Sequence, residues 1–253
     1  MKYILSLTFM LATFAFCNSI GEQFFMKGNE EYHKANYAQA LENYKQALSN
    51  KFIPPELYFN LGNTYYKLGS LGMAIANYKI AKSSIPRDRE LINNLEKTQQ
   101  QVQDNVSYPK INPAIKTLLI PLYFFGLDEI LWIFAGITSI ISLFLIIGVC
   151  FNAAFAKKYI PLLLILWIFA AIPATYYIWN FYNHSSAVVC VSEAPLFSGP
   201  ADSYTKIASL RDGCEVKVLD TIGDWTKIAF ITNEKYETAW IKNSDIFTVY
   251  TIY

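Results

Sequence analysis

The sequence is poor in the residues that build metal and redox centres. It contains only two histidines, His33 and His184, and four cysteines, none of which forms a C-x-x-C pair. Zinc sites need Cys and His ligands at short, regular spacings. The sequence therefore favours a protein without a metal site, and no residue pattern in it indicates a cofactor.

The chain also lacks a charge excess and a catalytic pattern. Lys and Arg number 21 and Asp and Glu 20, for a formal net charge of +1, so no overall field would recruit nucleic acid. A nucleophile with its base, paired carboxylates in an apolar setting and a phosphate-binding glycine loop are all missing. We expect a binding protein rather than an enzyme.

Apolar residues are abundant, at 53% of the chain, and they are gathered in runs. Residues 1–17 have the basic start and short apolar stretch of a signal peptide. Residues 130–151 and 159–182 carry no charge, and each run is long enough to cross about 30 Å of hydrocarbon. The loop 152–158 contains Lys157 and Lys158, which predicts that it is cytoplasmic. We expect two transmembrane helices and a lipid bilayer around them.

Residues 22–106 show an internal repeat of 34 residues, the period of tetratricopeptide (TPR) helical hairpins. The recurring residues are Gly28-Asn29 with Gly62-Asn63, Tyr32 with Tyr66, Ala40-Leu41 with Ala74-Ile75, Asn43-Tyr44-Lys45 with Asn77-Tyr78-Lys79, and Ala47 with Ala81. The repeats cover about 21–54 and 55–88. Gly28, Gly62, Ala40 and Ala74 are expected to be small because the two helices of a hairpin cross closely there. Residues 89–106 then predict a capping helix, which starts after the N-cap residue Asp88, and 107–129 predict a linker or interfacial segment.

The inner helix of each hairpin is expected to line a groove for a peptide or protein segment. The candidate binding residues are Phe25, Asn29, Tyr32, His33, Phe59, Asn60, Asn63 and Tyr66. The alternative is that Asn29 and Asn63 bond locally or to solvent. The residues that would complete a carboxylate clamp are missing, because Phe25, Glu90 and Asn94 stand at the positions where TPR clamps are cationic.

Residues 185–253 change to the alternating pattern of short strands, which predicts a small β barrel. An expected turn at residues 195–200 and the pairs Asp224-Trp225 and Trp240-Ile241 resemble those of bacterial SH3-like domains. Trp225 and Trp240 are expected to fill the core of the barrel, with a ligand-facing position as the alternative. Cys190 and Cys214 either form a disulfide in this domain or remain thiols.

Together these features predict a multi-domain protein: all-α TPR hairpins, two transmembrane α-helices and a small all-β SH3-like barrel. This order of segments resembles the BatE-like proteins of the bacterial aerotolerance operon. The resemblance implies a place in the bacterial inner membrane, with both domains on the outer side and von Willebrand-type Bat membrane proteins as partners. It also implies a role in oxidative-stress tolerance. The alternative is a cell-wall-binding or sensor protein whose SH3-like domain contacts peptidoglycan.

Overall fold

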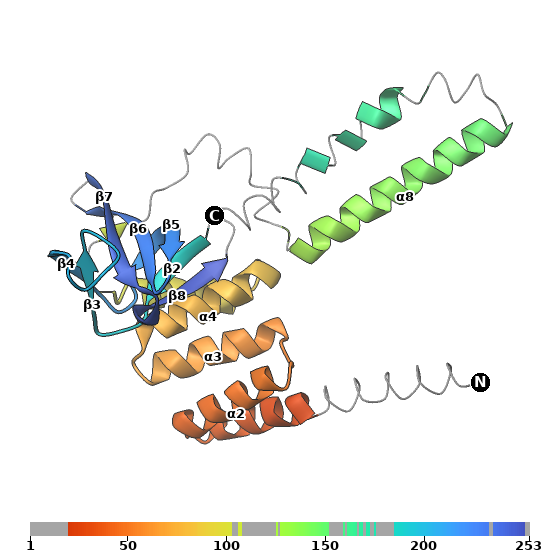
Figure 1. Ribbon diagram of the computed structural model, residues 1–253. Helices are drawn as coiled ribbons and strands as arrows, with labels where there is room; N and C mark the ends of the chain where they lie inside the picture. The colour runs from red at the N-terminus through yellow and green to blue at the C-terminus, as the bar shows by residue number, and fades with distance from the viewer. Residues whose placement is uncertain are drawn as a thin grey trace, which may run out of the picture. The chain divides into compact units, whose positions relative to one another are not determined.

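The computed structural model describes residues 20–102, 106–107, 125, 127–151, 159, 161–165, 167–168, 171–172, 175, 185–232 and 235–250. It combines helical hairpins, an antiparallel sheet and one long apolar helix (Figure 1). The expected signal peptide, most of the linker and the expected loop 152–158 lie outside the described residues. The chain divides into two compact units, and the first comprises Met1–Lys82, Asp88–Pro109 and Ser186–Val249.

The helices of the first unit follow the predicted hairpins. They are the helix over 20–33, α2 (Tyr37–Ser49), α3 (Pro55–Lys67), α4 (Leu71–Ser84) and α5 (Arg89–Gln99). Pro55 occupies the first position of α3, where its missing N–H costs nothing. Gly69, with a φ of +80°, makes the turn between α3 and α4. As predicted, the Asp88 side chain caps α5 by accepting from the Leu91 N–H at 2.9 Å.

The repeated glycines are small because each faces a tyrosine ring of the partner helix. A Cβ added to Gly28 would lie 2.5 Å from the ring of Tyr44, and Gly62 stands in the same relation to Tyr78. Both tyrosines are buried. The sequence prediction that small residues let the two helices of a hairpin cross closely is therefore confirmed.

The predicted capping helix is too long. It was expected to reach residue 106, but α5 ends at Gln99, and Val102 packs against the apolar core of the sheet. Val106 and Ser107 then form the short strand β1 (Val106–Ser107), which pairs with β6. The chain leaves the helix here, and the partly buried Val102 packs against the sheet instead of continuing the polar surface of α5.

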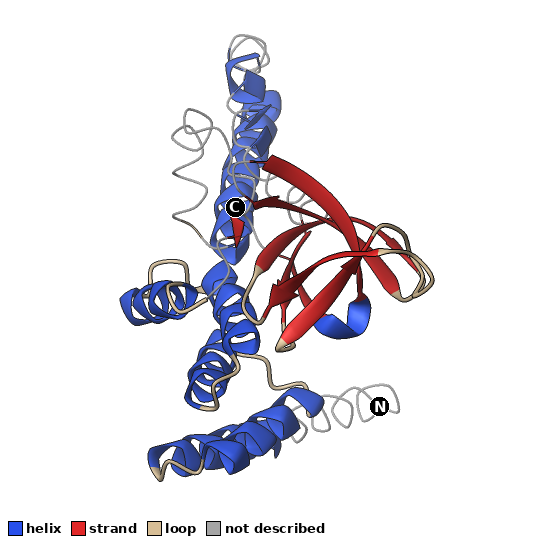
Figure 2. Ribbon diagram, turned by 90° about the vertical axis from the view of Figure 1, so that its left-hand side faces the viewer, coloured by secondary structure: helices blue, strands red, loops and turns tan. Residues whose placement is uncertain are grey.

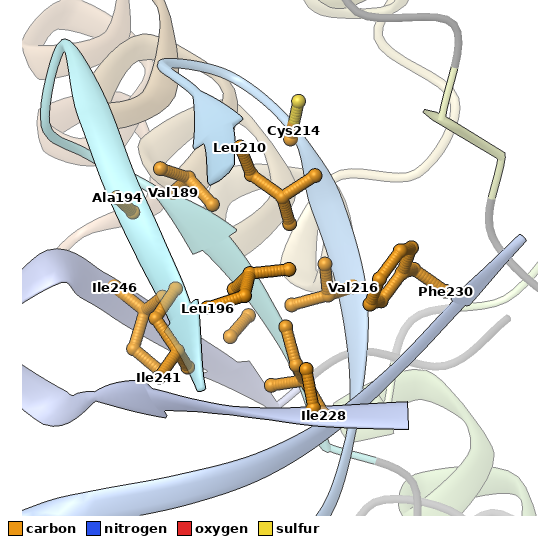
Figure 3. Packing of buried hydrophobic residues seen from close by; sticks show 12 residues of the cluster. Val189, Ala194, Leu196, Leu210, Cys214, Val216, Ile228, Phe230, Ile241 and Ile246 are labelled. Atoms are coloured by element: carbon orange, nitrogen blue, oxygen red, sulfur yellow. The ribbon is translucent and has the colours of Figure 1, made fainter. Parts of the chain in front are cut away.

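The β-strands form one antiparallel sheet in the order β4-β3-β7-β6-β5-β2-β8, with β1 paired to β6 off this path. They are β2 (Ser185–Val189), β3 (Glu193–Phe197), β4 (Lys206–Arg211), β5 (Glu215–Ile222), β6 (Trp225–Thr232), β7 (Lys235–Lys242) and β8 (Ile246–Tyr250). We call the domain of strands β2 to β8 the β domain. The sheet curves around one apolar cluster (Figure 2), in which Leu196, Val216 and Ile228 point toward one another (Figure 3).

Two details of the β prediction are wrong. Residues 195–200 were expected to form a turn, but Pro195 and Phe197 belong to β3, and the chain bends only after Phe197. Trp225 and Trp240 were expected in the core, yet both are half-buried and lie outside the core cluster. Because side chains alternate along a strand, the buried Ala239 and Ile241 on either side place Trp240 on the opposite face.

The second unit contains α8 (Leu127–Phe151), whose segment Glu129–Ile146 is long and apolar enough to cross a membrane. It is the one such helix among the described residues. Trp132 in this helix is 77% exposed. The second expected span, 159–182, falls largely outside the described residues, so it remains a prediction. Trp167, one of the described residues of this span, donates a hydrogen bond from Nε1 to Thr138 Oγ1 of α8 at 3.2 Å.

Candidate functional site

The predicted binding residues come together on three helices that are linked by asparagine side chains. Asn29 Oδ1, on the helix 20–33, accepts hydrogen bonds from Tyr44 Oη at 2.8 Å and from Asn60 Nδ2 at 2.9 Å. Asn60 belongs to α3, so this one amide oxygen ties three helices together. Because both bonds are partly buried, Asn29 has a clear structural role.

The same arrangement recurs one repeat later. Asn63 Oδ1, on α3, accepts from Tyr78 Oη at 2.7 Å and from Asn94 Nδ2 at 3.0 Å. The two asparagine sets fix the helix 20–33, α3 and α5 side by side. We call these three helices the inner helices. Local or solvent bonding of Asn29 and Asn63, the alternative considered from the sequence, does not describe these contacts, because the side chains bond between helices.

The two predicted phenylalanines also pack within the helical core. The Phe25 ring lies 6.0 Å from the Tyr44 ring and 5.4 Å from the Phe52 ring, centroid to centroid. Phe59 lies 6.1 Å from Tyr78. These partly buried rings therefore contact the tyrosines that bond to the asparagines.

The tyrosines that bond to the asparagines are buried. Desolvation raises the pKa of Tyr44 and of Tyr78 above the ordinary value of 10.0. The hydroxyls therefore remain protonated donors at physiological pH. Desolvation also raises the pKa of Tyr32, followed by the effects of Tyr37 and of Glu90.

The remaining predicted residues form the accessible surface of the inner helices. The Tyr32 ring contacts Tyr37 edge-on at 5.3 Å and His33 at 6.4 Å, and His33 is exposed. Tyr66 accepts a hydrogen bond at its hydroxyl from Gln101 Nε2 at 2.7 Å. The Lys97 ammonium lies 5.6 Å from the centre of the Tyr66 ring.

Lys97 and Gln101 were missed by the sequence prediction. The 34-residue repeat could have identified both residues. Lys97 lies 34 positions after Asn63, which itself lies 34 positions after Asn29. Gln101 lies 34 positions after Lys67, the equivalent of His33. The sequence prediction has two repeats, with residues 89–106 as a cap. In the structure α5 occupies the place of a third inner helix and contributes to the same surface.

A second candidate surface lies on the outer face of the β domain. Phe197 and Trp225 contact edge-to-face, with ring centres 5.2 Å apart. The Lys242 ammonium lies 5.5 Å from the Trp225 ring and pairs with the Asp202 carboxylate at 2.8 Å. Trp240 is directly opposite both Phe197 and Lys227 in the strand register. We call these residues the aromatic face.

Cys190 and Cys214 are thiols in the structure and do not form the disulfide considered from the sequence. Cys214 belongs to the core of the sheet. The Cys190 thiol instead donates to the Val188 carbonyl at 3.3 Å. Burial, and next the nearby Asp212, raise the pKa of Cys190 to about 12, so this thiol is poorly suited to redox chemistry.

Among the described residues, no group of three or more His, Cys, Asp or Glu side chains could hold a metal ion. Comparison with known proteins adds no assignment, since no family model and no curated protein matches this sequence.

Proposed function

We propose that this protein is a membrane-anchored scaffold that binds protein segments through its inner helices. We also propose that its helical hairpins are TPR hairpins and that its β domain is SH3-like. The observation that supports this most is the surface of Tyr32, His33, Tyr66, Lys97 and Gln101. It combines aromatic rings, a cation and amide groups on helices that the asparagines hold in place. Rigid arrays of this kind bind extended or helical protein segments without chemical turnover.

The membrane anchor rests on α8 and on the predicted second span. An apolar helix with Trp132 and Ile140 strongly exposed is stable where lipid surrounds it. The contact between Thr138 and Trp167 supports a helix pair. We propose the bacterial inner membrane as the location, with the helical hairpins and the β domain both on the outer side.

For the partner, we propose von Willebrand-type membrane proteins of a Bat-like complex linked to oxidative-stress tolerance. This part rests on the order of segments in the sequence alone. An anchored scaffold suits such a complex because fixing two proteins at one membrane raises their effective concentration for each other.

A second candidate function is attachment to the cell wall through the β domain. The specific observation in its favour is the aromatic face, since Phe197, Trp225 and Trp240 lie outside the core. Half-exposed aromatic rings beside Lys227 and Lys242 are available to a peptidoglycan ligand. Sedimentation with purified cell wall, for the native chain and for Trp225→Ala, tests this candidate.

The test of the scaffold function is affinity capture of the tagged full chain from its native membrane. We expect von Willebrand-type membrane proteins in the captured material and a loss of at least about tenfold with the pair Tyr32→Ala and Tyr66→Ala. Tyr236→Ala is the matched control, because Tyr236 is 58% exposed on the β domain. Equal recovery from both variants would place the binding site elsewhere.

A further inference from the structure

Helices α2 and α4 occupy the same place in successive hairpins, yet their outer faces differ. On α2, Gln39, Glu42 and Lys45 are exposed. The residues 34 positions later on α4 are Met73, Ala76 and Lys79, of which Ala76 is 0% and Lys79 6% exposed. A helix that is apolar or buried all round must be covered on two sides. One side of α4 packs in its hairpin, so something else covers the other.

The β domain covers that side, and the fit requires a glycine. A Cβ at Gly72 would collide with the Val189 backbone carbonyl of β2 and would lie 2.5 Å from Asp212 Oδ1. The equivalent residue of α2, 34 positions earlier, is the exposed Ala38. An alanine is therefore compatible with this position of the helix, and glycine is needed at position 72 because β2 approaches α4 closely there.

Charged groups of the β domain complete the contact. The Asp212 carboxylate, in the turn between β4 and β5, accepts from the Leu71 N–H at 2.8 Å and from the Gly72 N–H at 3.0 Å. It thereby caps the start of α4, where helix N–H groups lack partners. Glu215, at the start of β5, pairs with the buried Lys79 of α4 and also accepts from Gln99 of α5.

The sheet contains strands from both sides of the membrane segment in the sequence. β1 lies after α5 and before the membrane segment, and it pairs with β6 through Val106–Thr232 and Ser107–Ile231. β2 begins at Ser185, after that segment, and pairs with β5. These contacts can form only if residues up to 107 and residues from 185 are in the same compartment.

We propose that α4 and α5 form an intramolecular docking surface for the β domain, and that this contact is a latch that closes only when the membrane segment has returned to the side on which it started. The latch rests on the proposed membrane anchor. It makes the β domain the terminal cap of the helical hairpins, the role that repeat arrays need at their ends. The hairpins then reach full stability only after the second crossing.

The test exchanges the buried charge pair in the detergent-solubilised full chain. Lys79→Glu and Glu215→Lys each place two like charges together, and we expect proteolysis within residues 20–102 to accelerate at least about tenfold. The double variant restores an opposite pair and should return to within about threefold of the native rate. Lys45→Glu, at the exposed equivalent of Lys79 on α2, should have no effect.

Native rates in both single variants would overturn the latch, and so would a double variant that is no more resistant than either single one. The readout needs no binding partner. A failed latch is therefore distinguishable from a failed scaffold function, which the capture experiment measures separately.

Discussion

Asp212 and Gly72 are 140 residues apart in the sequence, and the Gly72 N–H donates to Asp212 Oδ1 at 3.0 Å. The expected membrane segment lies between them. The bond therefore joins a helix that precedes this segment to a turn that follows it. It shows how the helical hairpins and the β domain, which the sequence presents as separate modules, share one compact unit.

The pH dependence of Asp212 follows from its partly desolvated position. Desolvation raises its pKa above 3.8, although the N–H groups of Gly72, Leu71 and Gly213 act in the opposite direction. A raised carboxyl pKa means that the folded state binds the proton more tightly than the unfolded state, so this contribution to stability is present below pH 3.8 and is lost as the pH rises through the folded pKa. In denaturant unfolding, Asp212→Asn should lower the free energy of unfolding by less at pH 7 than at pH 4, compared with the native protein at the same pH. A constant difference would contradict this.

Replacement of Gly72 by alanine should destabilise the protein despite the better helix propensity of alanine. Propensity alone would favour Gly72→Ala by about 1 kcal/mol, but the collision with the Val189 carbonyl should leave a net loss of about 2 kcal/mol. Thermal unfolding of the full chain measures the change. Ala38→Gly, at the exposed equivalent position, should cost only the propensity difference of about 1 kcal/mol. A neutral Gly72→Ala would mean that β2 does not approach α4 this closely.

The asparagines should matter for stability through their oxygen atoms. Asn63→Leu removes the acceptor for Tyr78 and Asn94, and the free energy of unfolding should fall by about 2–3 kcal/mol. Asn63→Asp keeps an acceptor oxygen at the same place and should cost less. Chemical denaturation of the two variants distinguishes the cases. Equal losses would show that the amide nitrogen, rather than the oxygen, carries the effect.

Cys190 should be inert in the folded protein. Its pKa of about 12, raised by burial from 9.0, leaves almost no thiolate at pH 8, so an alkylating reagent should modify it only after denaturation. The stabilisation linked to the raised pKa of Cys190 is present below pH 9.0 and is lost as the pH rises toward 12. Mass spectrometry of reagent-treated protein measures the modification. Rapid labelling of folded protein at pH 8 would contradict the raised pKa of this partly buried thiol.

Much of the helical part could be predicted because its signals are local. The 34-residue offset, the small Gly28 and Gly62, and the N-cap Asp88 each reflect contacts within one hairpin or between neighbours. The end of α5 could not be predicted in this way. Val102 packs, after the helix has ended, against a sheet whose strands, apart from β1, begin more than 80 residues later, and no local pattern contains that partner.

The candidate site shows the same division. The inner helices were identified from the repeat, but the asparagines proved to be occupied by bonds between helices that only the assembled hairpins reveal. Trp225 and Trp240 were misplaced because a large aromatic ring in a small domain favours the core. The alternation of buried Ala239 and Ile241 around Trp240 was a better guide. The outer face of α4 also carried a signal, since its small and apolar residues replace the polar residues of α2.

The most direct test of the whole account is the side of the membrane on which each part lies. We would place single cysteines by Lys34→Cys, Lys157→Cys and Lys206→Cys in a chain whose four native cysteines are replaced, and treat intact cells with a membrane-impermeant thiol reagent. Lys34 and Lys206 are exposed on the helical hairpins and the β domain. The account predicts labelling at positions 34 and 206 before permeabilisation and at position 157 only afterwards. Labelling of 34 and 206 on opposite sides would contradict both the anchored scaffold and the shared unit that Asp212 and Gly72 join.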